Sequence, residues 1–86
     1  MPYEVVYSDI VVKRQIPKIP KANKEQIRRA IGERLVEDPR GHGKPLARKY
    51  KGLWRLRVGD CRVIYEITGN TVRVYSIKIR RDAYDD

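Results

Sequence analysis

The sequence is poor in the side chains that build metal sites and reactive thiols. Its 86 residues include one histidine, His42, and one cysteine, Cys61, and carboxylates cluster around neither. A structural zinc site takes about four ligands of this kind, so the sequence predicts no metal site and no cofactor. A single cysteine excludes an internal disulfide, and its place in a β-prone run predicts a buried, unreactive thiol.

Segments for membranes and for nucleotide chemistry are absent as well. No stretch approaches the ~20 apolar residues that a membrane-spanning helix needs, and none resembles a secretory signal peptide. A Gly-rich phosphate loop, a serine elbow and a carboxylate pair are all missing. These absences predict a cytoplasmic protein with no membrane function. A chain of 86 residues is expected to form one domain, residues 1–86, around a single modest core.

Positive charge is what the sequence has in excess. Its 20 lysines and arginines against 11 aspartates and glutamates give a formal net charge of +9. The segment from Pro39 to Arg62 contains eight of the basic residues and one acid, Asp60. Charge concentrated in this way is typical of proteins that bind polyanions, and an inert solvated surface is the alternative.

The first part of the chain predicts a strand and a short helix. Residues 3–7 are β-prone, and a Ser-Asp pair that can cap a helix precedes residues 10–16. Two prolines then stop this helix and make residues 18–19 an extended connector.

A longer helix and a long loop follow. Asn23, with Gln26 as its partner in a capping box, predicts the start of a helix over residues 24–37. Gly32 in the middle of this helix predicts a close packing contact. The glycines, prolines and cations of residues 38–52 predict a surface loop, and loops of this length are often functional.

Three strands joined by tight turns complete the chain. They are expected at residues 53–58, 61–67 and 71–79, with turns at Gly59-Asp60 and at residues 68–70. The fold class is therefore α+β. The N-terminal strand joins the edge of a three-stranded antiparallel meander, which gives a four-stranded sheet with one or two helices on one face.

Arginines alternate with apolar residues in the first strand of this meander. Arg55 and Arg57 share one face, and the other face carries Trp54, Leu56 and Val58. The two arginines are roughly 7 Å apart at the backbone, close to the spacing of successive phosphates. Arg62, at the start of the next strand, completes a triangle. Solvation of an open sheet face by these arginines is the alternative interpretation.

The run "LWRLRVGDCRVIYEI", preceded by a "PL…KGLWR" loop and followed by a basic "IRRDAY" segment, resembles the RelE/ParE superfamily of toxins. The similarity is densest from Pro45 to Tyr84. It implies a RelE-like α+β fold and a toxin of a type II toxin–antitoxin system. In the RelE branch it implies a metal-independent endoribonuclease that cleaves messenger RNA in the ribosomal A site by attack of a 2′-hydroxyl.

The resemblance also implies roles for individual residues. The catalytic positions of the family motif fall on Arg55, Arg57, Arg62, Arg80 and Tyr84. Arg62 and Arg80 are expected to hold the scissile phosphate, and Tyr84 to stack on or orient a base. Further RNA contacts are expected from Arg48, Lys49, Lys51 and Arg81.

The chain departs from the family pattern at two places. Some members have lysines where Arg55 and Arg57 stand, and often a Gly-His pair where this chain has Lys78-Ile79. Because arginine is a poor general base, proton removal is unassigned, with the loop lysines Lys49 and Lys51 as open possibilities. Reduced or absent nuclease activity would follow from these departures.

Two other functions compete with RNA cleavage. One is a ParE-like toxin that inhibits DNA gyrase with the same fold. The other is a non-catalytic module that binds RNA or the ribosome through its charge alone. For the toxin interpretations we expect an acidic, partly disordered antitoxin that lays a helix or strand along the basic sheet, with ribosome and messenger RNA as further partners.

Overall fold

The structure is a computed structural model that describes residues 2–79. Its elements in chain order are β1 (Glu4–Tyr7), η1 (Val11–Gln15), η2 (Ile16–Lys18), α1 (Lys21–Ala30), η3 (Ile31–Leu35), α2 (Pro39–His42), β2 (Lys44–Pro45), η4 (Arg48–Tyr50), β3 (Leu53–Val58), β4 (Cys61–Thr68) and β5 (Thr71–Ile79). A strand, helices and a meander follow one another as the sequence predicts. The α+β fold class is confirmed.

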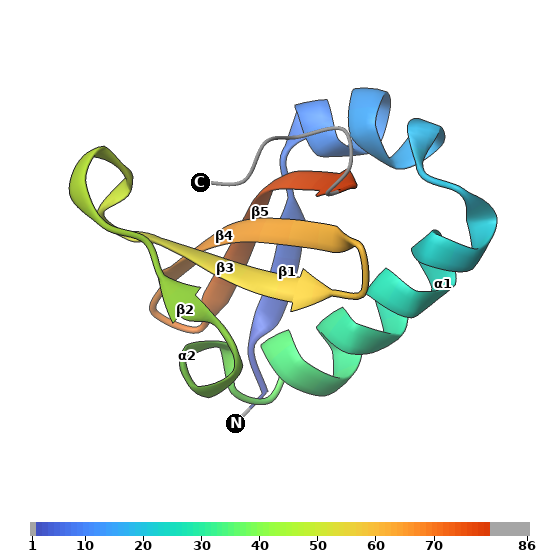
Figure 1. Ribbon diagram of the computed structural model, residues 1–86. Helices are drawn as coiled ribbons and strands as arrows, with labels where there is room; N and C mark the ends of the chain where they lie inside the picture. The colour runs from blue at the N-terminus through green and yellow to red at the C-terminus, as the bar shows by residue number, and fades with distance from the viewer. Residues whose placement is uncertain (1, 80–86) are drawn as a thin grey trace.

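The sheet has the strand order β1-β5-β4-β3-β2 (Figure 1). The predicted meander β3-β4-β5 is antiparallel, and β1 pairs with β5 in parallel, at one edge. The two-residue strand β2 is added at the other edge, so the sheet has five strands instead of the expected four. Two residues are too few for an alternating pattern, and Pro45 is tolerated there because an edge strand leaves some N–H positions unused.

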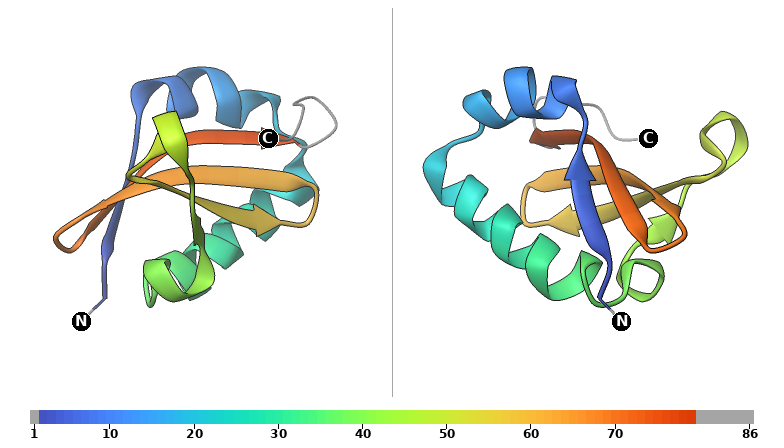
Figure 2. Two further views of the ribbon diagram at one scale, coloured as in Figure 1. Left: turned by 60° about the vertical axis from the view of Figure 1, so that its left-hand side comes forward. Right: turned by 180° about the vertical axis from the view of Figure 1, so that it is seen from behind.

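Apolar side chains of the helices cover one face of the sheet. The helical segments contribute Val11, Ile27, Ala30, Ile31 and Leu35, the connector between η2 and α1 contributes Ile19, and the strands contribute Leu56, Val58, Cys61, Val63, Tyr65, Val72, Val74 and Ile77. The loop that carries η4 projects from the side of the molecule opposite α1 (Figures 1 and 2). Because the helices pack on one face of the sheet, they do not cover the opposite face of the meander.

The long helix begins earlier than predicted. α1 starts at Lys21 behind Pro20, and no side chain caps it, so the predicted capping box of Asn23 and Gln26 is wrong. A proline fits this helix start because the first turn needs no donor from its backbone nitrogen. Asn23 lies within the helix instead, and its Nδ2 donates to the Cys61 Sγ at 3.7 Å.

The short helix and its connector are also displaced slightly. The predicted helix over residues 10–16 is confirmed as η1, but it continues as the 3-10 turn η2, which contains Pro17 and Lys18. Only Ile19 of the predicted connector is extended. The predicted packing contact at Gly32 is wrong, because a Cβ at this position would meet no atom within 4 Å.

The segment 38–52 has more regular structure than a loop. Asp38 caps α2 by accepting from the Gly41 N–H at 3.0 Å, and Pro39 is buried. The Tyr65 hydroxyl donates to the Pro39 carbonyl at 2.6 Å. Short elements such as α2, β2 and η4 have too few residues for a periodic signal, which is why composition alone predicts a loop.

Candidate functional site: a basic sheet face

Strand alternation sends a group of cations to the face of the sheet that the helices leave uncovered. In β3, Leu56 and Val58 are buried, while Arg57 between them is exposed. β4 alternates in the same way, with Cys61 and Val63 buried on either side of Arg62. The buried neighbours fix the strands against the core, and the arginines therefore point outward, as the sequence predicts.

The register brings these cations into rows across the strands. Arg57 of β3 lies opposite Arg62 of β4, and Arg62 lies opposite Lys78 of β5. Directly opposed residues have Cβ atoms about 5 Å apart, so three cationic side chains cross three strands side by side. In the next row Lys44 of β2 lies opposite Arg55. We call these five residues the cation face.

Such an arrangement favours the binding of negative charge. A phosphate that lies against neighbouring cationic side chains can contact more than one of them, and arginine forks match phosphate oxygens in two-point hydrogen bonds. The cation face is therefore suited to binding the phosphates of a nucleic acid.

Two members of the cation face are missing from the prediction. Lys78 would point inward if β5 kept a strict alternation from Arg73 onward. The β4–β5 register instead passes from Tyr65–Val74 to Ile64–Ser76, which leaves Tyr75 as the extra residue of a bulge and turns Lys78 outward. A sequence pattern does not reveal a bulge of this kind, and Lys44 depends on the short strand β2.

The other predicted site residues lie apart from this face or beyond the described range. Arg48, Lys49 and Lys51 are exposed on the projecting η4 loop, where the Lys49 Nζ lies 5.3 Å from the centroid of the Tyr50 ring. The predicted positions Arg80, Arg81 and Tyr84 lie outside the described residues. The structure therefore groups Arg55, Arg57 and Arg62 and places the loop cations on a separate element.

Residues 2–79 offer no exposed thiol and no cluster of metal ligands. Cys61 is buried, and burial raises the pKa of its thiol, with a smaller opposing effect of the hydrogen bond from Asn23. Within the same residues no group of three or more His, Cys, Asp and Glu side chains is placed to hold a metal ion. No helix in residues 2–79 is long and apolar enough to cross a membrane.

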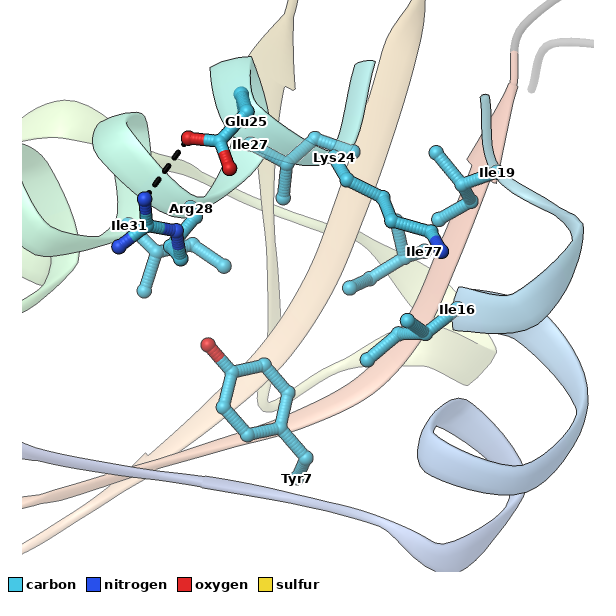
Figure 3. Close-up of a pocket in the computed structure, with 9 residues that line it drawn as sticks. All are labelled: Tyr7, Ile16, Ile19, Lys24, Glu25, Ile27, Arg28, Ile31 and Ile77. Atoms are coloured by element: carbon cyan, nitrogen blue, oxygen red, sulfur yellow. Dashed lines mark hydrogen bonds and ion pairs between the residues drawn. The ribbon is translucent and has the colours of Figure 1, made fainter. Parts of the chain in front are cut away.

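An apolar groove of about 280 Å³ opens on the helical side of the molecule (Figure 3). Isoleucines from η2, α1 and β5 line it, and the ion pair between Arg28 and Glu25, at 2.8 Å, lies at its rim. The described residues that line the groove are mostly isoleucines, and its one carboxylate, Glu25, is paired with Arg28. The cation face is thus the better candidate for the functional site.

Comparisons with known proteins place this chain in a family. A family model described as the ParE toxin of type II toxin–antitoxin systems, parDE, matches residues 2–84. No curated protein sequence matches the chain.

Several solved structures are similar to the chain. A chain of the toxin–antitoxin complex RelBE2 from Mycobacterium tuberculosis has a TM-score of 0.87 and 27% identity, covering 93% of this chain and 100% of that one. A chain of the RelE–RelB complex from Pyrococcus horikoshii has a TM-score of 0.71 and 25% identity, covering 96% of this chain and 100% of that one. The fold alone is shared with E. coli YafQ, at a TM-score of 0.59 and 19% identity over 96% and 99% of the two chains. The chain belongs to the ParE toxin family of type II toxin–antitoxin systems, within the RelE/ParE superfamily.

Proposed function

We propose that the protein is an endoribonuclease toxin that cleaves messenger RNA in the ribosomal A site, with the cation face as its active surface. The observation that carries this proposal is the row of Arg57, Arg62 and Lys78 across three strands. A single phosphate set against this row is within reach of more than one cation. Binding of this kind would stabilise the extra negative charge of a pentacoordinate phosphorus.

The reaction is a transesterification that needs no metal ion. The 2′-oxygen of one ribose attacks the adjacent phosphorus, and the bond from phosphorus to the 5′-oxygen of the next nucleotide breaks. The 2′-hydroxyl gives up its proton to a base, and the departing 5′-oxygen takes one up. The products are a 2′,3′-cyclic phosphate and a 5′-hydroxyl, and the cations stabilise the charge that develops between these states.

The residues of the row differ in what they offer this reaction. Arg57 and Arg62 can provide two-point contacts to phosphate oxygens through their guanidinium groups. Lysine amines act as proton carriers in enzymes, so Lys78 is the member of the row suited to proton transfer. Lys49 and Lys51, the other candidates for the base, lie on the projecting loop. Arg80 and Tyr84 keep their proposed roles at the phosphate and at a base.

A second candidate function is favoured by the family model, which describes a ParE toxin. A ParE-like protein would use the same fold to inhibit DNA gyrase without cutting RNA. The cation face supports the RNA-cleaving function more directly, because a surface for binding a protein does not require three cations in one row.

We also propose an acidic antitoxin as the partner of the protein. The net charge of +9 favours a partner of opposite charge, and similar chains are found in complexes named RelBE2 and RelE–RelB. An antitoxin segment with several acidic residues would neutralise the cation face and block access of RNA.

Two assays on the purified wild-type protein separate the candidate functions. Primer extension on a defined message carried by ribosomes should reveal cuts within A-site codons, with 5′-hydroxyl ends. A supercoiling assay with purified gyrase should remain unaffected. Inhibited supercoiling with an intact message would overturn the proposal in favour of the ParE-like function, and RNA binding without either effect would leave a non-catalytic module.

A further inference from the structure

A second polar site lies on the same side of the sheet as the cation face, nearer the turn between β4 and β5. The Tyr75 hydroxyl donates to the Glu66 Oε1 at 2.9 Å, in an exposed hydrogen bond. Arg73 lies opposite Glu66 in the β4–β5 register and is exposed. We call Glu66, Arg73 and Tyr75 the Tyr–Glu site.

We propose that the Tyr–Glu site binds a guanine base of the RNA whose scissile phosphate lies on the cation face. The inference rests on the proposed function and extends it to a preference for one base. In this arrangement Tyr75 stacks on the base, Glu66 accepts hydrogen bonds from the edge of the base, and Arg73 contacts a neighbouring phosphate.

The hydrogen-bonding pattern of a carboxylate selects guanine. The Watson–Crick edge of guanine presents two N–H donors side by side, which two carboxylate lone pairs accept together. Adenine and cytosine present one amino donor beside a ring acceptor, which a carboxylate repels, and uracil flanks its single donor with two carbonyl oxygens. Guanine is therefore the base that Glu66 would bind most tightly.

The carboxylate of Glu66 has hydrogen-bonding capacity to spare. An ionised carboxylate has about four lone-pair positions, and the Tyr75 hydroxyl occupies one of them. Within residues 2–79 the one ion pair joins Arg28 to Glu25, so Arg73 forms none with Glu66 in the described part of the chain. The hydrogen bond from Tyr75 is also the main reason why the pKa of this tyrosine is raised, which keeps the phenol a donor to Glu66.

The bulge brings Tyr75 to this surface. Tyr75 has no partner in the β4–β5 register, and 38% of its surface is exposed. Bulges re-aim side chains and are common beside functional sites. An exposed aromatic ring next to cations is the combination on which bases of single-stranded RNA stack.

The spacing fits a single strand of RNA. Glu66 follows Arg62 by four residues on β4, a distance of roughly 13 Å along the strand. This distance is about two steps between successive phosphates at roughly 7 Å each. Leu53, which pairs with Glu66, follows the η4 loop directly, so Lys49 and Lys51 lie at the same end of β3. The cation face and the Tyr–Glu site therefore follow one another along β4, and the loop cations precede β3 at the end where Leu53 pairs with Glu66.

Equilibrium binding of short RNAs tests the inference with the full-length purified protein. The probes are labelled uridine heptanucleotides that carry one central guanine or one central adenine, compared by fluorescence anisotropy at a fixed salt concentration. We expect the wild type to bind the guanine probe about 5-fold or more tightly than the adenine probe. Glu66→Gln should bring this ratio close to one, while Glu33→Gln on the helical side, which removes the same charge, should leave it unchanged.

Two substitutions at Tyr75 separate stacking from hydrogen bonding. Tyr75→Ala should weaken binding of both probes about 5-fold or more, because stacking does not depend on the base, whereas Tyr75→Phe should bind as the wild type does. Circular dichroism confirms that each variant folds.

Equal affinities for the two probes, or a guanine preference that survives Glu66→Gln, would overturn the inference. Ribosome-dependent cleavage with no guanine preference would overturn it while the proposed function stands. A guanine preference lost in Glu66→Gln, without cleavage, would support the Tyr–Glu site and contradict the endonuclease.

Discussion

At the scale of single residues, Tyr65 links the sheet to the segment that carries α2 and β2. Its side chain is fully buried. Its ring and the ring of Trp54 are stacked, with their centroids 6.5 Å apart. Its hydroxyl donates to the carbonyl of Pro39 at 2.6 Å. This bond fixes the start of α2, the helix that leads into β2, so a core residue holds the segment that carries Lys44 against the sheet.

Replacing this hydroxyl should lower stability. In Tyr65→Phe the Pro39 carbonyl keeps the Gly43 N–H, at 3.3 Å, and loses the shorter of its two hydrogen bonds. We expect the free energy of unfolding to fall by about 0.5–1.5 kcal/mol in urea denaturation. Tyr75→Phe is the matched control, since its hydrogen bond is exposed and its loss should change stability by less than ~0.5 kcal/mol. Equal losses in the two variants would contradict this role for Tyr65.

The same hydroxyl should make stability depend on pH in the alkaline range. Burial, and to a lesser degree the charge of Asp38, raises the pKa of Tyr65 from 10.0 to about 12. The stabilisation of the neutral phenol is therefore complete below pH 10 and is lost as the pH rises from 10 towards 12. Between pH 8 and pH 11 the stability difference between the wild type and Tyr65→Phe should shrink by roughly 1 kcal/mol. A stability difference between the two proteins that stays constant from pH 8 to pH 11 would contradict this role for the Tyr65 hydroxyl.

At the scale of elements, Gly32 in the long helix and Gly43 after α2 differ in the space around them. A Cβ on Gly43 would overlap the hydroxyl of Tyr65, whereas a Cβ on Gly32 would meet nothing within 4 Å. Gly43→Ala should therefore lower the free energy of unfolding by about 1–3 kcal/mol. Gly32→Ala should raise it by about 0.5–1 kcal/mol, because alanine is the better helix former. Thermal and urea unfolding measure both, and a Gly43→Ala protein as stable as the wild type would contradict the close fit.

The elements also show which side-chain orientations and helix ends a sequence pattern can predict. The alternation in β3 and β4 predicts correctly that Arg55, Arg57 and Arg62 point away from the core, because apolar residues of the core side flank each of them. The bulge at Tyr75 hides the orientation of Lys78, since one extra residue reverses a period of two. The residue type of Asn23 predicts a helix cap, but Pro20 starts that helix three residues earlier.

At the scale of the whole molecule, the position of a charge should matter more than its count. Arg57→Ala and Arg29→Ala each remove one positive charge, the first from the cation face and the second from α1. If a phosphate contacts Arg57, its loss should reduce the slope of log affinity against log salt for single-stranded RNA by about 0.7. Arg29→Ala should leave the slope unchanged. Equal changes in the two variants would indicate that RNA responds only to net charge.

The net charge and the lack of metal ligands are features of the whole sequence, and by themselves they point to a polyanion-binding surface. The register across three strands does not follow from them. It depends on pairings between residues far apart in the chain, such as Arg62 with Lys78. Composition therefore predicts the class of ligand, and only the fold reveals which cations can meet one phosphate.

The most direct test of the central claim is the rate of A-site cleavage on ribosomes for Arg57→Ala, Lys78→Ala and the control Arg29→Ala, measured by primer extension in single-turnover conditions. The two substitutions in the row should slow cleavage by about 100-fold or more, because each removes a cation from the developing phosphate charge. Arg29→Ala should cleave at the wild-type rate. Row variants that cleave as fast as the wild type would contradict the assignment of the cation face as the active surface.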